Sequence, residues 1–302
     1  MTSKRLNNDF ALADTLSFIE SKGGITIAMI SNEHASAQIA LYGAHVMSFE
    51  PNDSDEVLMM SSKCVFEKGT PLRGGIPVCF PWFGPNKNDN TLPMHGFARI
   101  MNWKVLESQQ LKSGETILKL YLSTSPATLK LWPYPFTCEL TFTIGKKLHI
   151  EWQVTNNSNE EFEFSQALHS YFATDDISQI NVSGLEGVHY LDALNQLTDT
   201  VETEPSIVID KEVNRCYLNT NSKCTLSDNG MNRKIEIIKT GSQSTVVWNP
   251  WIETSKKFND LRDDEYNDFI CIETANVHQN IITLTPGQSH SMSLSIAVLP
   301  IK

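Results

Sequence analysis

Two side chains in apolar surroundings are of types that can move protons. His169 lies in the segment SQALHSYF, and Glu273 follows the apolar run of FICIETAN. An imidazole with an ordinary pKa of about 6.5 and a carboxyl with one of about 4.3 can serve as acid and base near neutral pH. Because a buried unpaired carboxylate is costly, we expect Glu273 at a strand end or in a polar cleft. A hydrogen-bonded structural histidine and a solvated strand end are the alternative interpretations.

Other patterns of catalytic centres are absent from the sequence. No H-x-x-x-H or H-x-H pair indicates a metal site, and neither a G-x-S-x-G elbow nor a phosphate-binding P-loop occurs. On the residues alone, an acid/base enzyme and a carbohydrate-binding sandwich without turnover are both open.

A segment rich in proline and glycine is a candidate wall for such a site. Residues 72–99 read LRGGIPVCFPWFGPNKNDNTLPMHGFAR, with Arg73 and Arg99 near the ends and His95 in a turn. Proline removes backbone donors and glycine permits positive φ, so a long helix or a central strand is excluded here. The apolar side chains of VCFPWF nevertheless favour burial. We expect a rigid irregular loop beside a cleft; a connection packed over a sheet end is the alternative.

Most of the remaining chain alternates apolar and polar residues, as strands with one buried face do. Turns every 8–12 residues favour an all-β fold, an antiparallel β-sandwich or barrel. The predicted strands are Ile25–Ile30, Ala35–Phe49 (interrupted near Gly43), Val57–Met60, Trp103–Ser108, Thr116–Ser123, Ala127–Trp132, Phe136–Ile144, Leu148–Thr155, Phe162–Phe172, Ile180–Ser183, Ser206–Ile209, Lys223–Ser227, Lys234–Thr240, Thr245–Trp248, Phe269–Thr274, Asn280–Leu284 and His290–Leu299.

The chain has no repeat and no linker, so residues 1–302 are expected to form one domain with 1–20 as an N-terminal extension. Within Asn8–Ser21 a short helix is expected, because Phe10, Leu12, Leu16 and Ile19 can share one face.

Composition excludes several classes of partner. A net charge of −11 argues against nucleic acid and anionic membrane surfaces. The six cysteines form no C-x-x-C pair, and with no secretory apolar region they indicate reduced thiols in the cytoplasm. No apolar run is long enough to span a bilayer. We therefore expect a small-molecule partner, no nucleic-acid or membrane partner, and a monomer or weak dimer.

Five segments in this order resemble the aldose 1-epimerase superfamily: RGGIPVCFPWFGP, HGFAR, LHSYF, VVWNPW and CIETAN. More narrowly they resemble its hexose-6-phosphate mutarotase (glucose-6-phosphate 1-epimerase) branch, from about Ser21 onward. The resemblance implies a large β-sandwich of the galactose-mutarotase type with a cleft on one sheet. It also implies interconversion of the α and β anomers of hexose 6-phosphates, without a metal or other cofactor.

By the same resemblance, Glu273 is the base that takes the anomeric hydroxyl proton and His169 is the acid that protonates the ring oxygen. His95 would hydrogen-bond the sugar near the reacting oxygen. Arg73 and Arg99 match the positions that grip the 6-phosphate, and guanidinium groups suit phosphate oxygens.

Two positions depart from the family pattern and bear on which hexose is used. Met94 stands where some relatives carry Gln, and Asn214 stands where the family tends to show Asp, which leaves a hydrogen-bonding amide without charge as a substrate contact. Trp248 and Trp251 are candidates for an apolar platform under the sugar or for core packing, and Asp192 is a further polar candidate. A free-sugar mutarotase for galactose or glucose and a non-catalytic carbohydrate-binding sandwich remain the alternatives.

Overall fold

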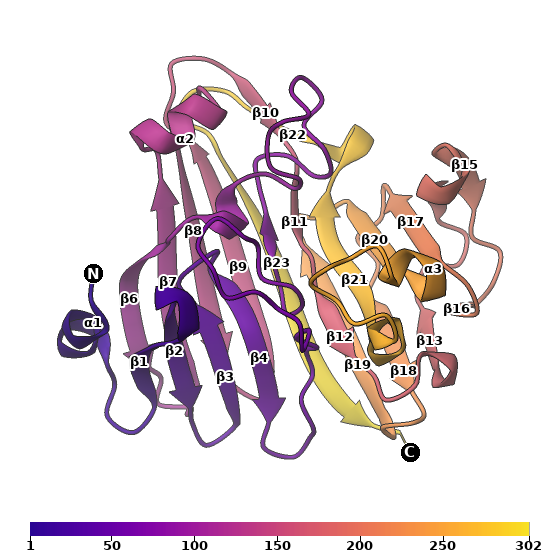
Figure 1. Ribbon diagram of the computed structural model, residues 1–302, viewed down its shortest axis with the longest axis horizontal. Helices are drawn as coiled ribbons and strands as arrows, with labels where there is room; N and C mark the ends of the chain where they lie inside the picture. The colour runs from indigo at the N-terminus through magenta and orange to yellow at the C-terminus, as the bar shows by residue number, and fades with distance from the viewer. Residues whose placement is uncertain (302) are drawn as a thin grey trace.

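The computed structural model describes residues 1–301 and consists mainly of antiparallel strands in two stacked layers (Figure 1). One layer is a nine-stranded sheet in the order β16-β13-β18-β19-β23-β9-β8-β7-β6. Its strands are β6 (Lys104–Gln110), β7 (Thr116–Ser123), β8 (Phe136–Ile144), β9 (Lys147–Asn156), β13 (Ile180–Ser183), β16 (Ser206–Val208), β18 (Cys224–Asp228), β19 (Arg233–Thr240) and β23 (Ser289–Pro300). Within it, β23 joins the β6–β9 meander to β19 by pairing with both β9 and β19.

The other layer contains an eight-stranded and a four-stranded sheet, which an isolated bridge between Val46 and Ile76 connects. The eight-stranded sheet runs β15-β14-β17-β20-β21-β11-β5, with β12 also paired to β21. Its strands are β5 (Val78–Cys79), β11 (Gln166–Leu168), β12 (Tyr171–Ala173), β14 (His189–Asp192), β15 (Thr198–Val201), β17 (Val213–Leu218), β20 (Ser244–Asn249) and β21 (Phe269–Asn276). The four-stranded sheet contains β1 (Leu16–Glu20), β2 (Thr26–Ser31), β3 (Ala35–Ala40) and β4 (His45–Pro51); β10 (Phe162–Phe164) and β22 (Ile282–Leu284) form a separate pair.

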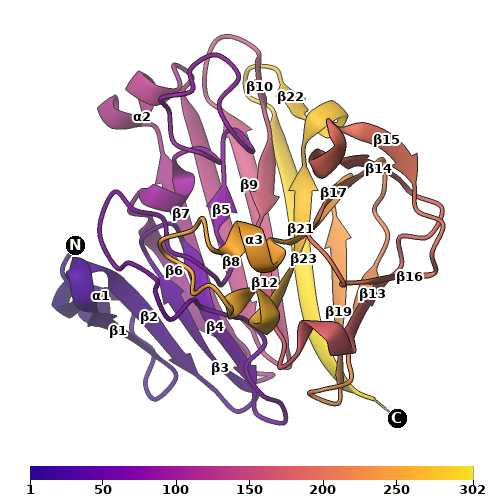
Figure 2. The ribbon, with the colours of Figure 1, turned by 45° about the vertical axis from the view of Figure 1, so that its right-hand side comes forward.

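The main core lies between the layers. Strands β7 and β8 alternate buried and half-buried residues along their whole lengths, as the sequence pattern predicts. Their inward residues Leu120 and Phe142 share one apolar cluster with Ile39 of the four-stranded sheet and Ile272 of the eight-stranded sheet. Figures 1 and 2 show the four-stranded sheet over β6–β9, beside the eight-stranded sheet. The all-β sandwich prediction is confirmed.

The predicted helix within Asn8–Ser21 is wrong in position. Helix α1 covers Ser3–Phe10, capped by the Thr2 side chain, and Leu16–Glu20 forms strand β1. Leu16 and Phe18 are buried in alternation, which is a strand period that the helical interpretation overlooked. The Asn7 side chain bonds both the N–H and the C=O of Phe18, at 2.8 and 2.7 Å, so α1 is fixed to β1.

The predicted strand at Ala127–Trp132 is also wrong, because these residues belong to helix α2 (Pro126–Leu131). Ser125 and Thr128 form a reciprocal capping box, and Pro126 occupies the first turn, where a missing N–H costs nothing.

The remaining helical segments are short: α3 (Trp251–Ser255) and the 3₁₀ turns η1 (Lys22–Gly24), η2 (Ala98–Ile100), η3 (Ile177–Gln179), η4 (Ala193–Asn195), η5 (Glu265–Asp268) and η6 (His278–Asn280). Val57–Met60, predicted as a strand, makes only isolated bridges, Leu58 to Phe172 and Met60 to Gly74. None of the helices within residues 1–301 is long and apolar enough to cross a membrane.

Candidate active site

Glu273 lies inside strand β21, because the strand continues to Asn276 instead of ending after the carboxylate as the sequence suggested. Alternation along β21 sends Ile270 and Ile272 into the main core and turns Glu273 to the opposite face. That face is covered, since the Glu273 side chain is only 1% exposed. A solvated strand end is therefore excluded.

His169 meets this carboxyl from the segment between β11 and β12. Its Nε2 lies 3.3 Å from Glu273 Oε1. The ring stacks on Tyr171, with centroids 4.9 Å apart and planes 13° from parallel, and meets the edge of Trp248 at 5.9 Å. The His169 N–H donates to the Pro77 carbonyl at 3.0 Å, which ties the histidine to the 72–99 segment.

Burial sets the electrostatics of the pair. It raises the pKa of Glu273 well above its ordinary value, against the smaller opposing effect of Arg99. It lowers the pKa of His169 well below its ordinary value, with His95, Arg99 and Arg73 acting in the same direction. The uncharged forms are favoured on both residues. Compared with a neutral histidine and an ionised carboxylate, the pair therefore holds one additional proton, which either Glu273 or His169 can carry. Within residues 1–301, Glu273 Oε2 and His169 Nδ1 are buried without hydrogen-bond partners.

His95 borders the pair with a fixed tautomer. The Gly84 N–H donates to His95 Nδ1 at 3.2 Å, and burial lowers the pKa of His95 to about 3, with Arg99 and Arg73 reinforcing the effect. A neutral ring that accepts at Nδ1 carries its proton on Nε2, so Nε2 is a donor. The ring lies edge-on to His169 at 5.7 Å.

The turn that carries His95 requires glycine next to it. Gly96 has φ of +75°, and a Cβ there would lie 2.0 Å from the Phe80 carbonyl oxygen. The close backbone approach fixes His95 against the VCFPWF run.

Arg73 is held on three sides. Its Nη1 donates to the Tyr171 hydroxyl at 3.0 Å, its Nη2 lies 3.1 Å from Asp260 Oδ1, and its guanidinium lies over the Phe258 ring at 4.7 Å. Burial opposes the charge, but Tyr171 and Asp260 outweigh it and raise the pKa of Arg73. Because Tyr171 also stacks on His169, one side chain contacts both the arginine and the acid/base pair.

Arg99 has a different environment. Its Nη2 donates to the Met94 carbonyl at 2.6 Å, and it forms no ion pair with a carboxylate in residues 1–301. Burial lowers the pKa of Arg99, partly offset by Cys79 and Tyr171, and the neighbouring Arg73 charge lowers it further. The guanidinium still keeps its charge at neutral pH, as arginine does in proteins.

A family model described as aldose 1-epimerase matches residues 26–297. The chain belongs to the aldose 1-epimerase family. It is 36% identical over 251 residues to an Escherichia coli K12 protein named "Putative glucose-6-phosphate 1-epimerase", with 83% of each chain covered. The crystal structure of a "putative mutarotase" from Salmonella typhimurium has a TM-score of 0.89 at 32% identity, over 96% of each chain. The galactose mutarotase related enzyme from Lactobacillus acidophilus has a TM-score of 0.74 at 17% identity, over 91% of this chain and 98% of the other. The predicted family and galactose-mutarotase-type fold are confirmed.

In this member of the aldose 1-epimerase family, only some of the remaining residues predicted from the sequence lie on the side of the His169–Glu273 pair. Trp248 contacts His169, whereas the ring contact of Trp251 is with Tyr266, at 5.2 Å. Asn214 pairs with Trp248 across β17 and β20, so it lies on the same sheet face as Glu273, two strands away. The Asp192 side chain instead caps the η4 turn by accepting from the Leu194 N–H.

Asp260, Phe258 and Tyr171 contribute to the site but were not singled out from the sequence. Asp260 and Phe258 lie in the loop 256–264, between α3 and η5, where no motif or periodicity marks them. Their importance comes only from contact with Arg73, which is distant in sequence.

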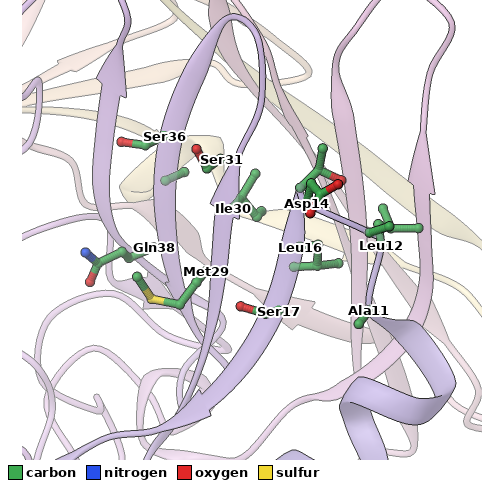
Figure 3. A pocket seen from close by; sticks show the side chains of 13 residues that line it. Ala11, Leu12, Asp14, Leu16, Ser17, Met29, Ile30, Ser31, Ser36 and Gln38 are labelled. Carbon is green, nitrogen blue, oxygen red and sulfur yellow. The ribbon is translucent and has the colours of Figure 1, made fainter.

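A cavity lies elsewhere in the fold, and no metal-binding cluster within residues 1–301 accompanies the site. A cavity of about 530 Å³ lies against Ala11–Ser17, β2 and β3 (Figure 3), and Asp14 is its one titratable side chain. Among residues 1–301, no three histidine, cysteine, aspartate or glutamate side chains are grouped to hold a metal ion.

Proposed function

We propose that this protein interconverts the α and β anomers of hexose 6-phosphates, as a glucose-6-phosphate 1-epimerase. The observation that carries the proposal is the buried His169–Glu273 pair, 3.3 Å apart, beside two arginines. The name of the Escherichia coli relative, at 36% identity, supports the same reaction.

In the proposed mechanism, Glu273 takes the proton of the anomeric hydroxyl while His169 delivers a proton to the ring oxygen as the C1–O5 bond breaks. The open-chain aldehyde then rotates about C1–C2. The two residues exchange roles to close the ring on its other face. Ring opening starts from ionised Glu273 with protonated His169 and leaves neutral Glu273 with neutral His169, so both halves use one singly protonated pair.

The neighbouring side chains supply orientation and affinity. The Nε2–H of His95 donates to a sugar oxygen near the reacting centre, and Trp248 gives an apolar edge beside His169. Arg99 and Arg73 bind the 6-phosphate. Arg99 contributes a guanidinium without a carboxylate partner in residues 1–301, and Arg73 contributes one that is already oriented. Asn214, on the same sheet face as Glu273 and two strands away, completes the proposed substrate contacts.

The experiment is NMR exchange spectroscopy between the α and β anomers of glucose 6-phosphate, with and without the protein, compared with free glucose. We expect faster exchange for the phosphate sugar.

Glu273→Gln and His169→Asn should each lower kcat by roughly 10²-fold or more, and the two losses should not add, because both groups act in one step. Arg99→Ala should lower kcat/KM for glucose 6-phosphate about ten- to a hundredfold and leave glucose little changed. Faster exchange of free glucose by the unmodified protein would refute the phosphate specificity.

The proposal also covers organisation and location. One apolar cluster contains residues of all three large sheets, which supports a single domain over residues 1–302. Six free cysteines in residues 1–301, five of them buried, support a cytoplasmic location. We also propose that the protein is a monomer or weak dimer and that it binds no nucleic acid.

A further inference from the structure

Asp260 makes the one carboxylate contact to the arginines of the site within residues 1–301. Its Oδ1 lies 3.1 Å from Arg73 Nη2, and the two side chains are only 20% and 19% exposed. The Tyr171 hydroxyl accepts from Nη1 of the same guanidinium. Two acceptors on different nitrogens fix the plane of the guanidinium, since its donors form a rigid fork.

The loop that carries Asp260 is itself anchored. Leu261, next to Asp260, is fully buried against Tyr171 and Phe269. Phe258, two residues before Asp260, lies under the Arg73 guanidinium and meets the edge of Trp248 at 6.1 Å. The backbone on both sides of Asp260 is therefore held by packed side chains, which limits an incoming anion to displacing the carboxylate alone.

The loop and the Arg73 backbone share one support, Glu265. This 2% exposed carboxylate accepts from the Ser61 hydroxyl at 2.6 Å, the Ser62 N–H at 2.8 Å and the Arg262 N–H at 3.0 Å. The Ser61 N–H in turn donates to the Arg73 carbonyl at 3.1 Å. The position of Asp260 relative to Arg73 is thus built into the fold.

We infer that Asp260 is a positioning residue that determines phosphate specificity: it orients the Arg73 guanidinium for the substrate phosphate and stays in place when substrate binds. This inference rests on the proposed function and deepens it. The opposite role is a carboxylate that occupies the phosphate position and is displaced. The two roles predict opposite signs for the effect of removing Asp260.

The test compares Asp260→Ala and Asp260→Asn with the unmodified protein. The Asn variant removes the charge but keeps an oxygen that can accept from Nη2, and Asp263→Ala, an exposed carboxylate of the same loop, is the matched control. The readouts are kcat/KM for glucose 6-phosphate and for glucose by anomer exchange, and Kd for inorganic phosphate by calorimetry.

We expect Asp260→Ala to lower kcat/KM for glucose 6-phosphate by about tenfold or more, since misplacement by roughly 1 Å costs up to about a hundredfold. Phosphate binding should weaken in parallel, and glucose should change by less than about twofold. Asp260→Asn should lose less, and Asp263→Ala should match the unmodified protein. Tighter phosphate binding in Asp260→Ala, or equal losses on both sugars, would overturn the inference.

Failure of the proposed function has a separate signature. An unmodified protein that binds phosphate but does not accelerate anomer exchange would overturn the proposed function alone, and the phosphate Kd of the variants would still decide the role of Asp260. An unmodified protein that binds no phosphate would overturn both.

Discussion

The single proton on the His169–Glu273 pair predicts an unusual effect of Glu273→Gln on stability. In the unfolded chain Glu273 ionises with a pKa of about 4.3, whereas burial raises its pKa well above that value in the folded protein. A raised folded pKa gives stability that is present at low pH and lost as pH rises toward the folded value. Glutamine cannot ionise in either state, so the variant escapes this loss.

The size of the effect follows from proton counting. Above about pH 4.3 the folded unmodified protein keeps one proton on the pair that the folded variant lacks, while the unfolded chains do not differ. The variant therefore gains about 1.4 kcal/mol per pH unit relative to the unmodified protein, until pH reaches the last pKa of the pair. The difference in free energy of unfolding between the two proteins should therefore grow steadily as pH rises from about 5, for as long as the folded pair keeps its proton.

The assay is urea denaturation of both proteins at a series of pH values, followed by circular dichroism. The Glu273→Gln variant should have a kcat lowered by roughly 10²-fold or more, yet become more stable relative to the unmodified protein as pH rises. A stability difference that stays constant with pH would mean that the folded pair holds no extra proton. That result would refute both the electrostatic argument and the singly protonated pair on which the mechanism depends.

Three further predictions concern two buried charged or titratable side chains and the turn that carries His95. Burial lowers the pKa of His45 to about 3, so the stability that its neutral ring gives the folded protein is present above about pH 6.5 and is lost as pH falls. Between about pH 6.5 and pH 5 the free energy of unfolding of the unmodified protein should therefore fall by about 2 kcal/mol more than that of His45→Gln, measured by urea denaturation. The buried Arg233 guanidinium donates to three backbone carbonyls, so Arg233→Ala should cost at least about 3 kcal/mol in urea denaturation, and a loss below about 1 kcal/mol would contradict this. Gly96→Ala should lower kcat for anomer exchange strongly, because its Cβ would meet the Phe80 carbonyl at 2.0 Å; near-normal exchange would show that the turn can relax.

The sequence predicted strands best where one face is buried along the whole element. Thr116–Ser123 and Phe136–Ile144 match β7 and β8 residue for residue, because inward positions alternate without interruption. Strands β14, β15 and β17 were missed, and β15 is exposed at all its residues, so it has no apolar alternation to read. Helix α2 was missed because Ala127–Trp132 was interpreted as a strand, although Ser125 and Pro126 in front of it are a helix-start signal.

The candidate site was predictable to the extent that residue type reveals it. His169 and Glu273, a histidine and a carboxylate in apolar segments, do lie 3.3 Å apart. Their protonation and the tautomer of His95 follow from burial and from the Gly84 N–H, which are properties of the assembled structure. The contact between Asp260 and Arg73 could not be predicted, because nothing in the sequence distinguishes Asp260 from the exposed Asp263 of the same loop.

The position of β23 has a consequence for biosynthesis. This strand pairs with β9 on one side and β19 on the other, so the two halves of the nine-stranded sheet have no common partner until residues 289–300 have been synthesised. The β6–β9 meander can form early from local contacts, and β1–β4, which cover it, are synthesised before it, but β9 lacks its second neighbour until β23 is made late in translation. Chains that stop before residue 289 would leave β9 and β19 as open edges, which are templates for intermolecular pairing. We therefore expect prematurely terminated chains to be aggregation-prone and to need chaperones.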